Sequence, residues 1–309
     1  YCGGQKYFTG MEKPIKCWHR SGHGTQTLTQ VLANSCNIAL MDIISEIGPE
    51  TYYNYQKEFG FGEKTGIDLP FEESAQSLLH SLEQLKNAVN LATNSMGQGF
   101  NVTAIQAINS FAASINGGNL MRPYIVSQVL DKDRNLVSKS EPEVIRRVLS
   151  KEVSDEMKLM LESVVSSSGT GKQAVIEGYR IGGKTGTAQQ GKRENNEYTV
   201  SFVGFLPADN PEIISIAIID KAEEDIEGST SAAPMLREVL LGIIKLRSMS
   251  PSGTTSPDDN IMFENGSFKI PNFVGKDLVE TSEILNSLGV DYEFVGSAGS
   301  TVRTQIPVE

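Results

Sequence analysis

The sequence predicts an α/β fold in which an antiparallel sheet is flanked by helices. Two patterns support this. Apolar residues recur at helical spacing over 151–167, between a candidate N-cap at Ser150 and a terminating Gly169. Three runs rich in β-branched and aromatic residues follow, at 174–187, 197–206 and 212–220. Because consecutive strands with short connections pair antiparallel, these runs predict one sheet.

The remaining elements follow from the same kinds of periodicity. The sequence predicts two short helices within 25–48, which meet at Ser35-Cys36-Asn37. Further helices are expected at 82–92, 103–115 and 232–247, with a hairpin-like stretch at 121–149.

The chain length predicts about two domains. We expect a first domain over 1–247 and a linker over 248–267, which opens with the Ser- and Pro-rich stretch SMSPSGTTSPDDN. A small α+β unit is expected over 268–309.

Composition excludes several classes of protein. Hydrophobic residues make up 39% of the chain, or about 45% when glycine is counted and tyrosine is not, which is ordinary for a globular protein and argues against disorder, collagen or a disulfide scaffold. A net charge of -11 repels phosphate backbones and anionic lipids, so nucleic acid is not an expected partner.

No segment of the sequence is a candidate for a membrane span or a signal peptide. No apolar run is long enough to span a bilayer, and the start YCGGQKYFTG lacks the features of a signal peptide. Since the chain does not begin with Met, we expect it to be the C-terminal part of a longer protein. Any targeting or anchoring segment would then lie outside it.

The segment from Gly178 to Thr187 supports two chemical interpretations. The letters GYRIGGKT match the phosphate-binding pattern G-x-x-x-x-G-K-[ST], and a later apolar strand ends at Asp220. A phosphate-binding loop must open a helix, yet Thr185 is followed by GTAQQGKRENNE, which has no helical period. The nucleotide interpretation is therefore disfavoured.

The second interpretation is an acyl-transfer cleft, with Lys184-Thr185-Gly186 on one wall and Ser35-x-Asn37 on the other. An ammonium beside a hydroxyl can bind a carboxylate and relay a proton, and glycine lets the backbone approach a substrate closely. On the facing wall, an amide can hold a peptide group and a hydroxyl can pass a proton to a leaving amine.

Either motif alone has a structural explanation. Ser35 and Asn37 could simply cap helices, and Lys184 could be a solvated lysine on a strand edge. A second copy, Lys64-Thr65-Gly66, has no strand context or facing wall and is predicted to be a structural turn. The occurrence of both motifs in one chain favours the cleft.

With their flanks, these residues resemble the transpeptidase domain of class B penicillin-binding proteins over about 1–247. The features that carry the resemblance are CW-x4-GHG before SCN, FGFGEKTGIDLP, SMGQGFNVTAIQ, NGG-x4-P, SGTGKQA, and GGKTGTAQ before SFVGF-x-P. The tail IPNFVGKDLVETSEILNSLGVDYEFVG resembles a PASTA module without its last strand. The combination is most similar to the stage V sporulation protein D branch of Gram-positive spore formers.

The resemblance implies a role for each motif residue. Ser35 would relay a proton opposite Lys184, and Asn37 would position the substrate peptide or β-lactam amide. Thr185 and Thr187 would bind the terminal carboxylate of a D-Ala-D-Ala stem peptide, with the Thr187 backbone N–H forming half of an oxyanion hole.

The implied whole protein is a serine-type peptidoglycan D,D-transpeptidase and β-lactam target that uses no metal or other cofactor. It would be membrane-anchored on the extracytoplasmic face, with division or sporulation proteins as partners. The family's nucleophile lies in a Ser-x-x-Lys motif, and no serine here has lysine three residues later. By family order that motif belongs upstream of Tyr1, so we expect this chain alone to be inactive.

Two alternatives stay open at this point. One is a non-catalytic cell-wall-binding or scaffold protein that retains the fold without the upstream serine. The other, a β-lactamase or carboxypeptidase, is disfavoured by the PASTA-like tail and by the class B flanks.

Two cysteines and two histidines lie near the first motif: Cys17, His19, His23 and Cys36. Their spacing, C-x-H-x3-H-x12-C, fits no strong zinc pattern, so no metal is expected, and Cys2 has no evident partner. The family's compartment permits disulfides. We therefore hypothesise that Cys17 and Cys36 pair, which would pull the flanking Ser and Asn off their geometry and make activity depend on a thiol reductase. Two separate buried thiols are the alternative.

Overall fold

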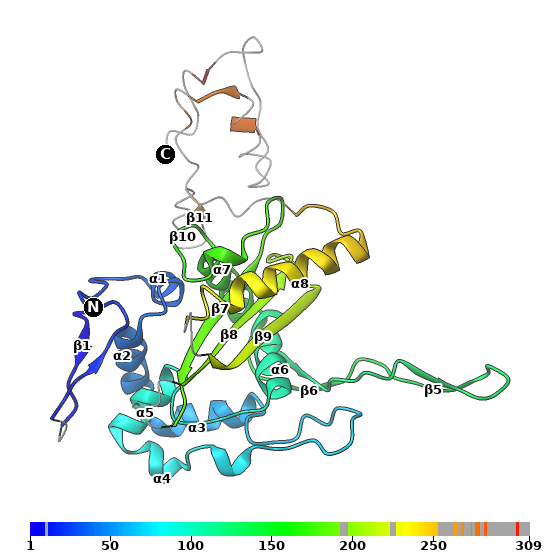
Figure 1. Cartoon of the computed structure of the whole chain (residues 1–309), viewed down its shortest axis with the longest axis horizontal. Coiled ribbons are helices and arrows are strands. Elements are labelled where there is room, and N and C mark those ends of the chain that lie inside the picture. Colours follow the sequence, from blue (N-terminus) through cyan, green and yellow to red (C-terminus); the bar gives the residue numbers. More distant parts are fainter. Residues whose placement is uncertain are drawn as a thin grey trace.

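The structure, a computed structural model, describes residues 1–9, 12–191, 197–222 and 227–252. Beyond these it describes the short stretches 263–264, 267–268, 273, 276–278, 281–282 and 301–302. At its centre is an antiparallel sheet in the order β7-β8-β9, with helices on both sides (Figure 1). The strands are β7 (Gly182–Gln189), β8 (Tyr198–Leu206) and β9 (Ile213–Ala222).

The second and third strands confirm the predicted runs, whereas the first begins later than predicted. The expected strand at 174–187 starts instead at Gly182. A 3₁₀ turn, η2 (Lys172–Ala174), and a bridge that joins Ile176 to Tyr179 occupy the preceding residues. High β-propensity there reflects burial rather than strand geometry, since Ala174 and Ile176 pack in the main core.

One face of the sheet is covered by α8 (Ala232–Arg247), which confirms the predicted C-terminal helix. Leu236 and Leu240 of α8 pack in a core cluster with Phe202 of β8. A Cβ at Gly204 would lie 2.6 Å from a Leu236 methyl, so glycine at this position lets helix and sheet approach closely.

The opposite face is covered by α6 (Ala104–Ile115) and α7 (Lys151–Val164), both close to their predicted bounds. Phe205 of β8 packs between Ile115 of α6 and Leu161 of α7. Strand side chains alternate between faces, so Phe202 and Phe205 serve opposite cores.

Five described helices precede α6 in the chain, and the first two of them carry the Ser35-Cys36-Asn37 segment. They are α1 (Leu28–Ala33), α2 (Asn37–Ile47), α3 (Pro49–Glu58), α4 (Leu82–Leu85) and α5 (Ala88–Ser95), followed in the chain by α6. The pair α1–α2 confirms the predicted junction. The helix predicted at 82–92 is two helices, because Asn87 accepts hydrogen bonds from the amides of Val89 and Asn90 and starts a new helix. A 3₁₀ turn, η1 (Gln76–Leu78), precedes them.

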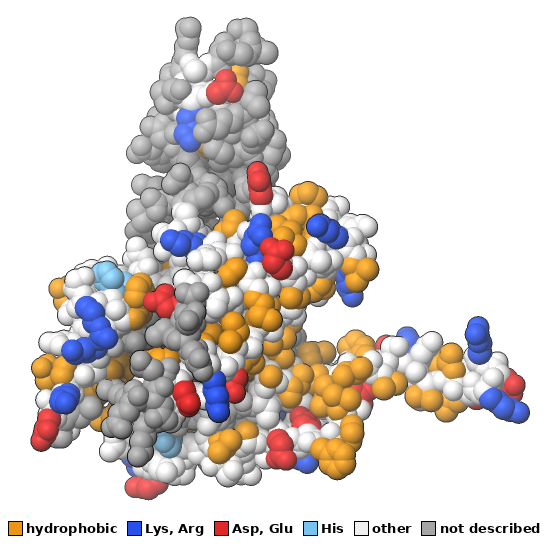
Figure 2. Space-filling model, viewed as in Figure 1, with side chains coloured by type: hydrophobic (Ala, Val, Ile, Leu, Met, Phe, Trp, Pro, Cys, Tyr) orange, Lys and Arg blue, Asp and Glu red, His pale blue; other side chains and the backbone are white. Residues whose placement is uncertain are grey.

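The predicted hairpin at 121–149 is a long arm that projects from the body (Figure 1). It consists of two ladders, β3 (Asn119–Met121) with β6 (Val144–Arg147), and β4 (Gln128–Leu130) with β5 (Leu136–Lys139). Its apolar side chains are exposed, as the orange atoms along the arm in Figure 2 show: Val129, Leu130, Leu136 and Val137. The outer ladder thus has little core of its own.

A two-stranded ribbon forms the N-terminus, from β1 (Gln5–Lys6) and β2 (Ile15–Lys16). Near the other end, β10 (Phe263–Glu264) pairs with β11 (Ser267–Phe268). Most of the predicted PASTA-like unit, including its helix at 277–288 and its last strands, lies outside the described residues. Among the described helices, none is long and apolar enough to cross a membrane.

Candidate active site

The junction between α1 and α2 presents Ser35 in an unusual backbone conformation. Ser35 has φ of 49°, in the left-handed region that few non-glycine residues adopt. Its amide donates to the Leu32 carbonyl, and the next residue, Cys36, occupies the N-cap position of α2 without a side-chain capping bond. Asn37 is the first residue of α2. The tight turn thus places the hydroxyl and the amide on one short, fixed segment.

The facing wall is β7, which lies at one edge of the sheet. The Lys184 ammonium donates to the Ser35 hydroxyl over 2.8 Å and to the Thr185 carbonyl over 3.0 Å. These two side chains are 149 positions apart in the sequence. The contact joins the two motifs that sequence analysis placed on opposite walls of one cleft.

The surroundings of Lys184 change its acid–base chemistry. Burial lowers the pKa of Lys184 to about 8, because the protein solvates an ammonium less well than water does. Desolvation is the only cause of this change. An amine whose pKa lies near neutral pH can both accept and return a proton, which suits it to a proton relay with the adjacent hydroxyl.

Thr170, which sequence analysis did not single out, ties the two walls together. Its amide and its hydroxyl both donate to the Ala33 carbonyl at the end of α1, each over 3.1 Å. The Thr185 hydroxyl in turn lies 3.2 Å from the Thr170 hydroxyl. The only signal in the sequence was the stretch SGTGKQA, which carried a resemblance but no chemical role.

The outer part of β7 is more open. Thr187 is exposed, and its hydroxyl accepts a hydrogen bond from the Gly228 amide over 3.3 Å. The Thr187 carbonyl accepts from the Gln98 side chain over 3.2 Å. A Cβ at Gly186 would lie 2.5 Å from the Ser201 hydroxyl, so a side chain there would collide with the neighbouring strand.

A depression of about 690 Å³ adjoins this end of the strand. It is lined by 97–102 on one side and by 188–191 with Thr199 on the other. Asn37 makes no hydrogen bond through its side chain to any residue in the described part of the chain, so its amide is available to a ligand. The depression itself is lined by none of the motif residues Ser35, Asn37, Lys184, Thr185 and Thr187.

The strand geometry removes the phosphate-loop interpretation. Residues after Thr185 continue as strand to Gln189 and do not open a helix. The amide cluster that holds phosphates at a helix N-terminus is thus absent from this segment.

The second copy of the tripeptide lies in an irregular loop, neither on a strand, as predicted, nor in a regular turn. The Thr65 amide and hydroxyl both donate to the Glu72 carboxylate over 2.6 Å, and the Gly66 amide donates over 3.0 Å. A smaller cavity of about 200 Å³ lies beside this loop. None of the residues that line it belongs to the Ser35–Lys184 pair.

Cys17 and Cys36 are both fully buried free thiols, and so is Cys2. Burial raises the pKa of Cys36 to about 11, because a thiolate is poorly solvated in its surroundings. The predicted Cys17–Cys36 disulfide stays a prediction.

A family model for the penicillin-binding protein transpeptidase domain matches residues 4–241. Stage V sporulation protein D of Bacillus subtilis is 38% identical over 95% of this chain and 45% of its own length. Penicillin-binding protein PbpB of Mycolicibacterium smegmatis is 31% identical over 76% of this chain and 38% of its own. The chain thus spans less than half the length of these curated relatives.

Solved structures show the same fold. Penicillin-binding protein 3 of Mycobacterium tuberculosis, complexed with ampicillin, superposes with a TM-score of 0.72 at 28% identity, covering 83% of this chain and 57% of that one. The apo transpeptidase domain of penicillin-binding protein 3 from Burkholderia pseudomallei gives 0.68 at 28% identity, covering 80% and 71%. By motif geometry, family model and structural likeness, this chain belongs to the penicillin-binding protein transpeptidase family.

Proposed function

We propose that the whole protein to which this chain belongs is a peptidoglycan D,D-transpeptidase that works through a serine acyl-enzyme and is inhibited by β-lactams. The observation that carries this proposal is the 2.8 Å hydrogen bond from Lys184 to Ser35. It brings a relay hydroxyl and an amine with a lowered pKa together across the cleft. The names of the relatives, which include peptidoglycan D,D-transpeptidases, support the same chemistry.

In this proposal each wall performs one task. The leaving amine of a D-Ala-D-Ala stem peptide needs a proton as the peptide bond breaks, and the Ser35 hydroxyl supplies it while Lys184 returns one to Ser35. Thr185 and Thr187 bind the terminal carboxylate, and Asn37 holds a peptide group of the stem. Their fixed positions lower the entropic cost of reaching the reactive geometry.

The nucleophile of the proposed reaction comes from a Ser-x-x-Lys segment outside this chain, since no serine here has lysine three residues later. The protein would act on the extracytoplasmic face, held there by an anchor that is also outside the chain. Division or sporulation proteins of cell-wall synthesis are its proposed partners. The region 268–309 would form a partial PASTA unit.

A fluorescent penicillin tests this proposal directly. The whole protein should become covalently labelled at a serine that lies three residues before a lysine, as peptide mapping by mass spectrometry would show. The 309-residue chain, incubated with benzylpenicillin, should gain no acyl mass. An acyl adduct on the chain alone would mean that a serine within it is the nucleophile, which contradicts the proposal.

The second candidate is a non-catalytic wall-binding or scaffold protein that has no such serine. That protein would keep the fold and sediment with purified peptidoglycan but take no penicillin label. The labelling of the whole protein therefore decides between the two candidates.

A further inference from the structure

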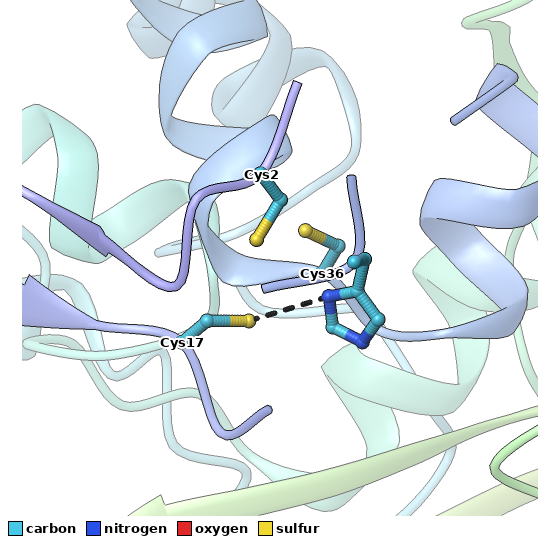
Figure 3. A group of neighbouring side chains, drawn as sticks. Cys2, Cys17 and Cys36 are labelled. Atoms are coloured by element: carbon cyan, nitrogen blue, oxygen red, sulfur yellow. Dashed lines mark hydrogen bonds between the residues drawn. The ribbon is translucent and has the colours of Figure 1, made fainter. Parts of the chain in front are cut away.

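Four side chains that could bind a metal converge beside the α1–α2 junction. The Sγ atoms of Cys2, Cys17 and Cys36 and a ring nitrogen of His23 all lie within 4.8 Å of one another. Figure 3 shows the three thiols and the imidazole turned towards a common centre. The Cys17 Sγ lies 3.6 Å from His23 Nδ1. Each residue comes from a different segment of the N-terminal region.

Backbone hydrogen bonds hold the segments around the cluster in place. Cys2 and Gly24 exchange a pair of bonds of 2.8 and 3.0 Å, which places His23 next to the first thiol. The Cys17 amide donates to the Gly4 carbonyl over 2.9 Å, and the Cys36 amide to that of Val31 over 3.0 Å. All four segments are thus held before any ligand binds.

Two glycines make this packing possible. Gly4 and Gly22 both have positive φ, and a Cβ on either would lie 2.2 Å from a backbone carbonyl oxygen. Only glycine fits so close an approach of two chain segments. The ribbon and the loop before α1 therefore pack tightly enough to bring Cys2 and Cys17 to the same point.

The chemistry of this set matches one class of ligand. Three thiols and one imidazole are a common set for structural zinc, which takes four ligands in a tetrahedron. With Zn–S bonds of about 2.3 Å, neighbouring sulfurs in such a site lie about 3.8 Å apart, so a closure of about 1 Å is sufficient here. All three cysteines are at most 1% exposed, which is typical of a closed structural site rather than an open catalytic one.

The orientation of the imidazole ring shows which of its nitrogens could bind a metal. Its Nε2 is buried without a hydrogen-bond partner among the described residues, while Nδ1 faces the thiol of Cys17. Nδ1 is therefore the ring nitrogen in position to bind a metal beside the three thiols, and Nε2 would then carry the ring proton.

We propose that Cys2, Cys17, His23 and Cys36 form a structural zinc site that clamps the N-terminal ribbon to the α1–α2 junction. Cys36 lies between Ser35 and Asn37, so the metal would hold both polar residues of this wall from behind. This set differs from the one that the sequence suggested, because Cys2 takes the place of His19. A Cys17–Cys36 disulfide would use two of the four ligands and exclude the metal, so the two states compete.

The test uses the 309-residue chain, purified under reducing conditions and loaded with zinc, and then with cobalt as a spectroscopic probe. We expect one zinc per chain and, with cobalt, the intense bands of tetrahedral thiolate coordination. X-ray absorption should show three sulfurs and one nitrogen around the metal. Zinc should also protect all three thiols from a thiol reagent, and a chelator should release them.

Matched variants identify the ligands. Cys2→Ser, Cys17→Ser, Cys36→Ser and His23→Ala should each lose stoichiometric zinc. His19→Ala should retain it, because His19 is an exposed histidine outside the cluster. Retention of zinc by any of the first four variants would overturn the proposed ligand set.

The unmutated chain decides the question even if a variant fails to fold. No zinc bound at stoichiometric addition, or a metal-free protein with a Cys17–Cys36 disulfide in its native state, would overturn the proposal. A cobalt spectrum without thiolate bands would do the same.

Discussion

The same tripeptide occurs twice in this chain and forms two different structures. Lys184-Thr185-Gly186 lies on an edge strand, where the lysine meets a hydroxyl from the other wall. Lys64-Thr65-Gly66 lies in a loop, where a carboxylate binds the threonine and glycine and leaves the lysine exposed. The difference shows that the letters carry chemistry only where the fold supplies a strand edge and a facing partner.

Replacing each lysine in turn with alanine should give the largest difference between the two copies of the tripeptide. In the whole protein, Lys184→Ala should slow labelling by a fluorescent penicillin by about 10²- to 10⁴-fold, because proton transfer loses its amine. Lys64→Ala, the matched control, should label at the unmutated rate. Equal rates for the two variants would mean that the contact with Ser35 has no part in the chemistry.

The two lysines should also differ in how they affect stability, because the pKa of Lys184 is lowered by burial. Its ordinary value of 10.5 falls to about 8 in the folded chain, so the unfolded chain binds this proton more tightly. The free energy of unfolding should therefore rise with pH between about 8 and 10.5, by up to about 3 kcal/mol from this group.

Urea unfolding of the chain at pH 7.5 and at pH 10.5 measures this rise. Lys184→Met should lack it, whereas Lys64→Met should keep the wild-type slope because that ammonium is exposed. A Lys184→Met variant with an unchanged slope would show that burial of the ammonium does not affect folding.

The stability of the loop that contains Lys64-Thr65-Gly66 should depend on another residue, Glu72. Partial burial opposes ionisation of Glu72, but hydrogen bonds from Thr65 and Gly66 outweigh it and lower the pKa of this carboxyl. Glu72→Ala should destabilise the chain by about 1–3 kcal/mol, because it leaves those donors without an acceptor.

The contribution of Glu72 should be present near neutral pH and lost as the pH falls through its lowered pKa. Thermal unfolding at pH 7 and pH 3 would show this, with the exposed neighbour Glu73→Ala as the control. Penicillin labelling of the whole protein should be unaffected by either variant. A loss of labelling in Glu72→Ala would connect the loop to the site.

Local patterns in the sequence predicted much of this structure. The helical stripe of α7 and the junction at Ser35-Cys36-Asn37 depend on residues close together in the chain, and both were predicted at nearly their observed bounds. The contact of Lys184 with Ser35 was predicted through the two motifs and a resemblance. Neither motif alone indicated the distance between them.

The features that were missed depend on tertiary contacts. Helix α3 is rich in tyrosine and has little apolar period. Its Tyr52 is partly buried by neighbouring elements, and the Tyr52 hydroxyl donates to the Asn94 carbonyl. Cys2 reaches the cluster only because it forms an isolated β-bridge with Gly24, a pairing that no local sequence pattern predicts. Thr170 owes its role to the position of α1.

The 2.8 Å contact between Lys184 and Ser35 joins two parts of the molecule that are built separately, a helical hairpin and a sheet. Under the proposed function, the proton path would be complete only when the two parts are docked. Covalent labelling of the whole protein by a fluorescent penicillin would then report correct docking, which its secondary-structure content alone does not reveal.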